Sequence, residues 1–229
     1  MSKQLKDYLF YQDDWATIYC GDCLFIMPLM EPESVDLVVT DPPYGISMDE
    51  GFEGFEGFGG LGIPIARRHY SDTWDKERPP KECFSMILKL SKNILIFGGN
   101  FFSDYLPVNG HWIVWDKLNT MPSFGDCELI WTNIKRNSVK KIVREYNGLM
   151  GKEETRYHPT QKPLDLIGKL ISNYGGQMIL DPFLGSGTTC LASKNLNRKS
   201  IGIEINPRYC EISVRRLRQE VFDFRKEIP

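Results

Sequence analysis

Residues 35–45 read VDLVVTDPPYG, and this stretch indicates the fold class. Four of its first five residues are aliphatic, which is typical of a strand covered on both faces of a parallel sheet. The strand then ends in a turn that combines a carboxylate, two prolines, an aromatic ring and a glycine. Because ligands of open α/β sheets bind beyond the carboxyl ends of the strands, this turn is a candidate functional site.

The rest of the chain repeats this alternation of short apolar strands and helices, which favours an α/β fold with a mostly parallel sheet. The predicted strands are Ala16 to Cys20, Val35 to Thr40, Asn93 to Phe97, Trp112 to Trp115, Glu128 to Trp131, Met178 to Leu180 and Ser200 to Ile203. Helices are predicted after Pro80, Pro163 and Asn206. At each of these positions, apolar residues follow at helical spacing.

Length and composition suggest one domain over residues 1–229, with 41% hydrophobic and 25% charged residues. The segments 46–75 and 132–157 do not look like packed elements, because the first contains a glycine-rich Gly-Phe-Glu repeat at 51–60 and the second is polar and basic with no clear period. We predict that they are surface inserts that contact the substrate, because long loops in compact domains are often functional. The arginines of the last helix are expected to face solvent: Arg215, Arg216 and Arg218.

Charge, cysteines and hydropathy restrict the function classes further. A net charge of −2 gives no bulk attraction for nucleic acid, so such contacts must come from local patches. Cys20 and Cys23 form a single Cys-x-x-Cys pair without the other ligands of a zinc site, so we expect reduced thiols and no metal. No apolar run reaches the roughly 18 residues of a membrane span. We therefore expect a cytoplasmic protein without membrane contacts.

The side chains of the first turn suit a planar group that carries an amino group. Asp41 and the carbonyl of Pro42 can each accept one amino hydrogen, while the ring of Tyr44 can stack on the plane. Pro42 and Pro43 also remove two N–H donors from the turn. The alternative is an ordinary turn, because Asp-Pro and Pro-Pro are both common in turns.

Residues 180–189, LDPFLGSGTT, form a second strand–turn–helix motif. Its glycines let the backbone approach a ligand, and the helix start attracts an anion. The spacing fits neither a Walker loop nor a dinucleotide glycine motif. Glu204 follows roughly 20 residues later, where a carboxylate can bind ribose hydroxyls. Asp22 follows the first strand and can accept an adenine amino group, although either acid could equally be a solvated loop residue.

Three segments together resemble the motifs of the amino-methyltransferase family of bacterial and phage DNA methyltransferases. They are DPPY at 41–44, HPTQKP at 158–163 and DPFLGSGTT at 181–189, and their order resembles the β class. The resemblance implies the Rossmann-like S-adenosylmethionine-dependent methyltransferase fold. That fold would have a mostly parallel seven-stranded sheet with one antiparallel strand, and a circularly permuted motif order.

The same resemblance implies S-adenosylmethionine as cofactor, S-adenosylhomocysteine as product, and no metal. The implied catalytic residues are Asp41, Pro42, Pro43 and Tyr44. The implied cofactor-binding residues are Asp22, Cys23, Asp41, Thr160, Lys162, Asp181, Pro182, Phe183, Gly185, Ser186, Gly187, Thr188, Thr189, Glu204 and Ile205. Within this set, Glu204 would hold the ribose and Asp22 the adenine. Thr160 and Lys162 would close over the methionine carboxylate.

The implied reaction is methyl transfer to the exocyclic amino group of a base flipped out of double-stranded DNA. Adenine N6 is favoured because an aspartate opens the motif. Cytosine N4, an RNA or protein-amide acceptor, and a DNA-binding protein without turnover are the alternatives. A homodimer and a cognate restriction endonuclease are further expected partners. The DNA contacts are assigned to the inserts 46–75 and 132–157, through Arg67, Arg68, His69, Lys135, Arg136, Lys140 and Lys141.

Overall fold

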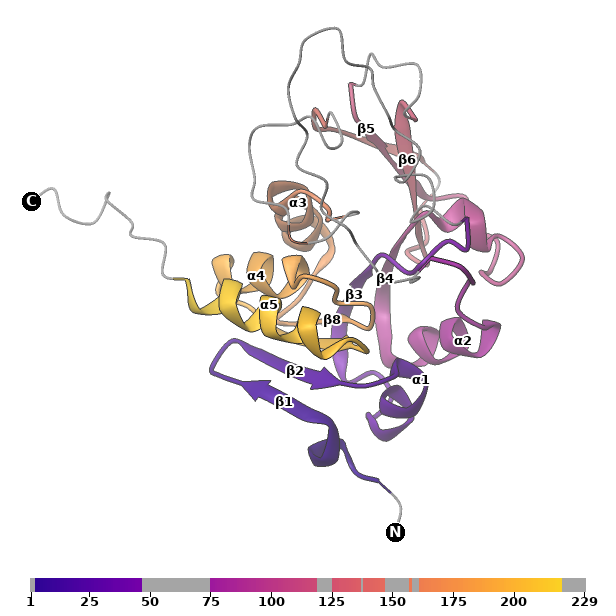
Figure 1. Ribbon diagram of the computed structural model, residues 1–229. Coiled ribbons are helices and arrows are strands. Elements are labelled where there is room, and N and C mark those ends of the chain that lie inside the picture. The colour runs from indigo at the N-terminus through magenta and orange to yellow at the C-terminus, as the bar shows by residue number, and fades with distance from the viewer. Residues whose placement is uncertain are drawn as a thin grey trace, which may run out of the picture.

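The computed structural model describes residues 3–46, 75–118, 125–136, 138–146, 157 and 161–219. Within these ranges the chain forms a nine-stranded sheet with helices on both faces (Figure 1). The strands are β1 (Leu9–Gln12), β2 (Ala16–Cys20), β3 (Val35–Thr40), β4 (Ser91–Phe97), β5 (Trp112–Asp116), β6 (Cys127–Thr132), β7 (Lys140–Val143), β8 (Met178–Asp181) and β9 (Lys199–Glu204). The α-helices are α1 (Cys23–Ile26), α2 (Lys81–Leu90), α3 (Leu164–Tyr174), α4 (Thr188–Asn195) and α5 (Pro207–Arg218). Short 3-10 helices are η1 (Leu5–Tyr8), η2 (Met27–Leu29) and η4 (Gly99–Phe102).

The strand order is β1-β2-β9-β8-β3-β4-β6-β5-β7. The five strands from β2 to β4 pair in parallel, whereas β6 is antiparallel to both of its neighbours. All seven predicted strands are present, and they form a continuous block in which β6 alone is reversed. β1 and β7 extend the two edges of this block. The prediction that segment 132–157 contains no packed element is wrong for residues 140–143, where Ile142 of β7 is buried.

The sheet also confirms the permuted order of the motifs. β8 and β9 come from the C-terminal part of the chain, yet they lie next to β2 from its beginning. In the sheet, β9 and then β2 lie on one side of β8, whereas β3 and then β4 lie on its other side. The strand order therefore reverses between β8 and β3. Such a switch point is where open α/β sheets place their ligands.

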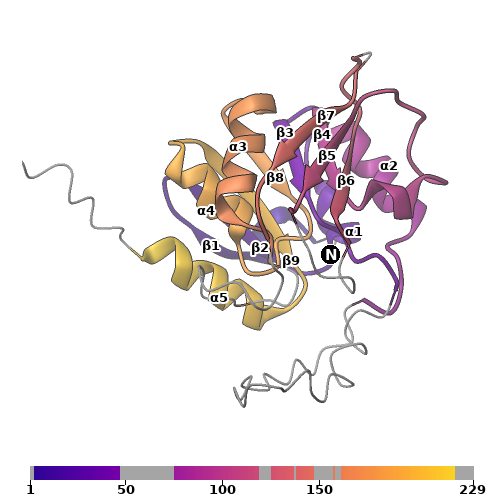
Figure 2. The same ribbon diagram turned by 90° about the horizontal axis from the view of Figure 1, so that it is seen from above.

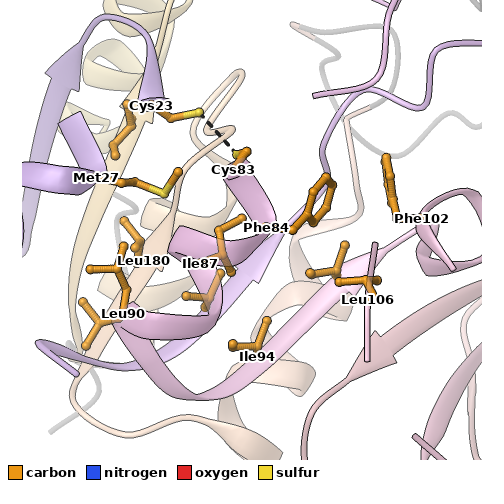
Figure 3. Packing of buried hydrophobic residues seen from close by; sticks show 14 of the residues in the cluster. Cys23, Met27, Cys83, Phe84, Ile87, Leu90, Ile94, Phe102, Leu106 and Leu180 are labelled. Atoms are coloured by element: carbon orange, nitrogen blue, oxygen red, sulfur yellow. Dashed lines mark hydrogen bonds between the residues drawn. The ribbon is translucent and has the colours of Figure 1, made fainter. Parts of the chain in front are cut away.

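The helices cover the sheet in two layers (Figure 2). α3, α4 and α5 lie on one face, and α1 and α2 lie on the other. α3 contributes its apolar side to the core, because Leu166, Ile167 and Leu170 are all buried. α2 packs in the same way through Phe84 and Ile87 (Figure 3).

The predicted helix starts are confirmed by the structure. Pro80 and Pro163 are the N-cap residues of α2 and α3, and the Asn206 side chain caps α5 by accepting a hydrogen bond from the Arg208 amide. All six cysteines are free thiols, and the sulfurs of Cys23 and Cys83 lie 3.8 Å apart. None of the helices in the described part of the chain is long and apolar enough to cross a membrane.

Gly98, at the end of β4, fixes the position of the DPPY turn. It has a left-handed backbone with φ of 61°, and a Cβ at this position would overlap the ring of Tyr44. Gly168 in α3 has nothing within 4 Å of an added Cβ. The two glycines therefore form a matched pair for substitution.

We expect Gly98→Ala to lower the free energy of unfolding by at least about 1–2 kcal/mol, because alanine is strained in this conformation. Gly168→Ala should instead raise it by about 0.5–1 kcal/mol, since alanine favours a helix interior. Urea unfolding measures both values. Equal midpoints for wild type and Gly98→Ala would contradict the close packing between Gly98 and Tyr44.

Candidate active site

A cavity of about 780 Å³ opens at the carboxyl ends of the parallel strands. This size lies within the roughly 300–1,000 Å³ of ligand pockets. Its lining includes one acidic residue at or after each of four adjacent strands, namely Asp22 (β2), Glu204 (β9), Asp181 (β8) and Asp41 (β3). The structure thus brings together four carboxylates that are far apart in the sequence. Among the residues that the structure describes, no three His, Cys, Asp or Glu side chains are grouped to hold a metal ion.

Most of the predicted site residues line this cavity. They are Asp22, Cys23, Asp41, Pro43, Lys162, Asp181, Pro182, Phe183, Gly185, Ser186, Thr188, Thr189, Glu204 and Ile205. Pro42 and Gly187 are not in the lining, and Gly187 instead packs closely against Ser213. Tyr44 lies beside the cavity with its hydroxyl on Asp41. Four predicted residues fall outside the described part of the chain: Arg67, Arg68, His69 and Thr160.

Asp181 ties the glycine turn to the neighbouring strand. One of its carboxylate oxygens accepts a hydrogen bond from the Thr40 hydroxyl at 2.7 Å, and the other accepts one from the Thr189 hydroxyl at 2.7 Å. The Phe183 amide donates to the first oxygen as well, at 3.1 Å. Burial raises the pKa of Asp181 to about 6 against the effect of these donors. Asp181 thereby connects β3, the end of β8 and the start of α4.

Glu204 lies at the opposite side of the glycine turn. Its carboxylate accepts hydrogen bonds from the Gly185 amide and the Asn206 amide, both at 2.8 Å. Burial raises the pKa of Glu204 to about 7, although both amides favour the ionised form. The next residue, Ile205, is 68% exposed, so an apolar side chain stands beside this carboxylate in the lining.

Two residues of α5 hold the glycine turn from behind. The Ser213 hydroxyl donates to the Gly185 carbonyl at 3.0 Å. Arg216 donates to the Ser186 carbonyl at 2.6 Å and to the hydroxyls of Ser186 and Thr188 at 3.1 Å. The expectation that Arg216 faces solvent is therefore wrong, whereas Arg215 and Arg218 are exposed as predicted. A buried guanidinium is stable here because three oxygens accept its hydrogens.

Gln161, within the HPTQKP segment, joins that segment to the glycine turn. Its side-chain oxygen accepts hydrogen bonds from the Ser186 hydroxyl and the Tyr157 amide, both at 3.1 Å. The Tyr146 hydroxyl donates to the Gln161 carbonyl at 3.1 Å. The motif order in the chain gave no indication of this contact, because the two segments are separated by α3.

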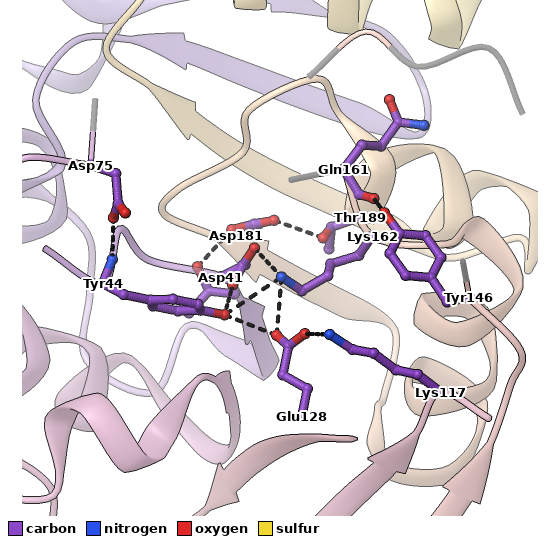
Figure 4. Close-up of polar contacts among 11 residues, drawn as sticks. Asp41, Tyr44, Asp75, Lys117, Glu128, Tyr146, Gln161, Lys162, Asp181 and Thr189 are labelled. Atoms are coloured by element: carbon purple, nitrogen blue, oxygen red, sulfur yellow. Dashed lines mark hydrogen bonds and ion pairs between the residues drawn. The ribbon is translucent and has the colours of Figure 1, made fainter. Parts of the chain in front are cut away.

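The DPPY turn carries the most concentrated charges of the cavity (Figure 4). Lys162 pairs with one oxygen of Asp41 at 2.6 Å, and the Tyr44 hydroxyl donates to the other oxygen at 2.5 Å. Glu128 of β6 is a second partner of Lys162 at 3.1 Å. The turn itself is held by Asp75, a buried carboxylate that accepts hydrogen bonds from the amides of Tyr44 and Gly45.

Burial and these contacts shift the pKa values of Asp41 and Lys162. Burial raises the pKa of Asp41, and Lys162 only partly offsets this effect. Burial alone would lower the pKa of Lys162, but the carboxylates of Asp41 and Glu128 raise it above its ordinary value. Lys162 therefore stays a cation. Its predicted contact with a methionine carboxylate remains a prediction, since its observed partners are these two acids.

The structure separates the predicted DNA contacts into two groups. Lys135 and Arg136 follow β6, and the guanidinium of Arg136 lies 5.7 Å from the ring of Tyr174 at the C-terminal end of α3. Because β6 is antiparallel, this places both residues at the edge of the sheet opposite the cavity. Lys140 and Lys141 are exposed on β7, and Lys141 pairs with Asp116 at 3.1 Å. None of these four residues lines the cavity.

The fold and cavity are those of an α/β methyltransferase, and the comparisons with known proteins agree. A DNA methylase family model matches residues 113–215. The type II methyltransferase M.HinfI of Haemophilus influenzae is 28% identical, over 96% of this chain and 71% of that protein. M.HpaI of Haemophilus parainfluenzae is also 28% identical, over 90% of this chain and 76% of that protein.

Solved structures give the same result. The M1.HpyAVI–SAM complex superposes with a TM-score of 0.58 and 26% identity, over 89% of this chain and 100% of that chain. The cytosine-N4-specific PvuII DNA methyltransferase has a TM-score of 0.63 over 94% of this chain and 91% of that chain, and at 17% identity it supports the fold alone. These comparisons confirm the resemblance drawn from the three motifs: in sequence and in fold, the chain is similar to DNA methyltransferases of the amino-methyltransferase family.

Arg216 offers a test of how the glycine turn is held. We expect Arg216→Gln to lower the free energy of unfolding by about 1.5–3 kcal/mol, because charged hydrogen bonds to Ser186 and Thr188 are lost. Affinity for S-adenosylmethionine, measured by calorimetry, should fall roughly tenfold or more with them. Arg215→Gln, at the exposed neighbouring position, is the control and should match wild type. Equal cofactor affinity in both variants would show that α5 does not shape the site.

Proposed function

We propose that this chain transfers a methyl group from S-adenosylmethionine to the exocyclic amino group of a base in double-stranded DNA, specifically adenine N6. The observation that carries this proposal is the shared cavity. Asp41 of the DPPY turn lines the same space as the glycine turn and Glu204. An acceptor for an amino group and a nucleoside-binding surface therefore face one another.

The residues of the cavity fit S-adenosylmethionine. Glu204 ends β9, where a carboxylate suits ribose hydroxyls, and its oxygens can accept bonds beyond those from the two amides. The exposed Ile205 offers an apolar surface to an adenine ring. Asp22 lines the same cavity, and the family resemblance assigns it as the acceptor for the amino group of that adenine. Gly185 has a left-handed backbone with nothing within 4 Å of an added Cβ, so the turn is open to a ligand.

Asp41 acts in this proposal as the acceptor for the amino group. S-adenosylmethionine would supply an electrophilic methyl group and leave as S-adenosylhomocysteine, and the methylated nitrogen would then release one proton to water. Hydrogen bonds from the amino group to Asp41 and to the Pro42 carbonyl would draw the nitrogen lone pair out of conjugation with the base ring. The rate enhancement then comes from positioning and from fixed charges rather than from a covalent enzyme intermediate. A base in a duplex must flip out of the stack to reach Asp41.

Adenine is favoured over cytosine because Asp41 opens the motif, and in the family an aspartate there is more typical of adenine enzymes. The fold itself does not discriminate, since a cytosine-N4-specific enzyme has a similar fold. Phosphate contacts by Lys140 and Lys141 on β7 would position the duplex. A cytoplasmic location, a homodimer and a cognate restriction endonuclease also belong to the proposal.

The test is to incubate the protein with labelled S-adenosylmethionine and unmethylated duplex DNA, and to identify the labelled nucleoside. We expect N6-methyladenine. Asp41→Asn should lower kcat roughly 100-fold or more, because it removes the charge that polarises the amino group. Asp14→Asn, an exposed aspartate before β2, should leave kcat unchanged.

Each other outcome identifies a different error. Label in N4-methylcytosine would retain the mechanism and overturn the choice of base. A protein that shifts duplex DNA in a gel without labelling it would be a binding protein that has kept the fold. Equal turnover by wild type and Asp41→Asn would remove Asp41 from the reaction.

A further inference from the structure

A second carboxylate, outside all three motifs, lies in the group of charges around Asp41. Glu128 is at the start of β6, and one of its oxygens lies 3.1 Å from the Lys162 amine and 2.9 Å from the Tyr44 hydroxyl. Its other oxygen pairs with Lys117 at 3.1 Å. The Glu128 side chain is only 14% exposed, so it belongs to the interior of the site rather than to its rim.

The direction of β6 explains why Glu128 reaches the site. β6 pairs antiparallel with β4, so its first residues lie at the edge where the parallel strands end. Glu128 pairs in register with Trp115 of β5, and the chain that continues from β5 supplies Lys117. The adjacent antiparallel strands β5 and β6 thus place an ammonium group and a carboxylate beside the DPPY turn.

The group is balanced in charge. Asp41 and Glu128 carry two negative charges, and Lys162 and Lys117 carry two positive charges. Buried ions are stable only when they are paired in this way. Burial alone would raise the pKa of Glu128, but the two lysines lower it below its ordinary value. Removal of one member would therefore leave an uncompensated charge beside Asp41.

Lys162 is shared between two acids, and this sharing matters for Asp41. An ionised carboxylate has about four acceptor positions, of which Lys162 and Tyr44 use two. If Glu128 were neutral, Lys162 would have Asp41 as its one close anionic partner and would compete more strongly with an incoming amino group. The Tyr44 hydroxyl has one proton and two carboxylate neighbours, so Glu128 also limits where that hydroxyl points.

We propose that Glu128 is a positioning residue that holds Lys162 and Tyr44 beside Asp41, so that Asp41 keeps an open acceptor position for the amino group. This role rests on the proposed methyl transfer. Glu128 does not itself contact the base or the cofactor in this account, and it acts through Lys162. Lys117 balances Glu128 from the side away from Asp41.

A double-mutant cycle with Glu128→Gln and Lys162→Gln tests the proposal, since glutamine keeps the shape and removes the charge. We expect each single variant to lower kcat by roughly 100-fold, Glu128→Gln through misplacement of Lys162 and Tyr44 and Lys162→Gln through protonation of Asp41. In Lys162→Gln, two acids would face one another with one lysine left, which favours protonation of Asp41. The double variant restores the balance of one acid and one lysine, so its kcat should exceed that of Lys162→Gln.

Glu33→Gln is the matched control, because Glu33 forms an exposed ion pair with Lys92 at 3.0 Å. It should leave kcat and the KM for DNA unchanged. A merely structural role for Glu128 would give losses that multiply in the double variant, and it would reduce the folded fraction seen by circular dichroism. Multiplied losses, or a Glu128→Gln variant with wild-type kcat, would overturn the proposal.

A second measurement does not depend on turnover. NMR of the ε-carbon of ¹³C-labelled lysine follows the titration of Lys162, whose signal is assigned from Lys162→Gln. Glu128→Gln should lower the pKa of Lys162, because one of its two anionic partners has become neutral. If wild type transfers no methyl group, the proposed function fails, and this titration still decides whether Glu128 holds Lys162. An unchanged pKa of Lys162 in Glu128→Gln would contradict the claim that Glu128 holds Lys162.

Discussion

The ion pair between Asp41 and Lys162, 2.6 Å long, connects the turn after β3 with the residues that precede α3. Both side chains are largely buried, with 21% and 10% of their surface exposed. Removal of either partner would therefore leave an unpaired buried charge and destabilise the protein. The pair fixes the DPPY turn relative to residues 161–163, the described part of the HPTQKP segment. Gln161, the neighbour of Lys162, then bonds to Ser186 of the glycine turn. The DPPY turn and the glycine turn are thereby coupled through two consecutive residues.

The two turns of the site are held by side chains that bond to their backbone. Asp75 accepts hydrogen bonds from the DPPY turn, and Arg216 and Ser213 hold the glycine turn from α5. Each of these side chains bonds to backbone groups of a turn that would otherwise lack partners. Rigid support of this kind lets fixed dipoles and charges act without reorganisation during a reaction. The sheet therefore sets the positions of the two turns, and Asp75 and α5 keep these turns rigid.

Sequence patterns predicted the seven strands of the central block, the starts of α2, α3 and α5, and most of the cavity lining. They missed the edge strands β1 and β7, because each has four residues and is too short to show a clear period. Glu128 was missed because β6 runs antiparallel, and the rule that sites follow the carboxyl ends of strands does not find the start of such a strand. Arg216 was assigned to solvent because its partners are backbone and hydroxyl oxygens distant in sequence.

The most direct test of this account is a crystal structure of the protein with S-adenosylhomocysteine and a duplex that carries its target base. The account predicts that the amino group of the flipped base lies within hydrogen-bond distance of Asp41. Lys162 should then remain between Asp41 and Glu128, and Glu204 should contact the ribose. A complex in which Lys162 leaves both acids to bind the methionine carboxylate would contradict the central role of the Asp41–Lys162 pair.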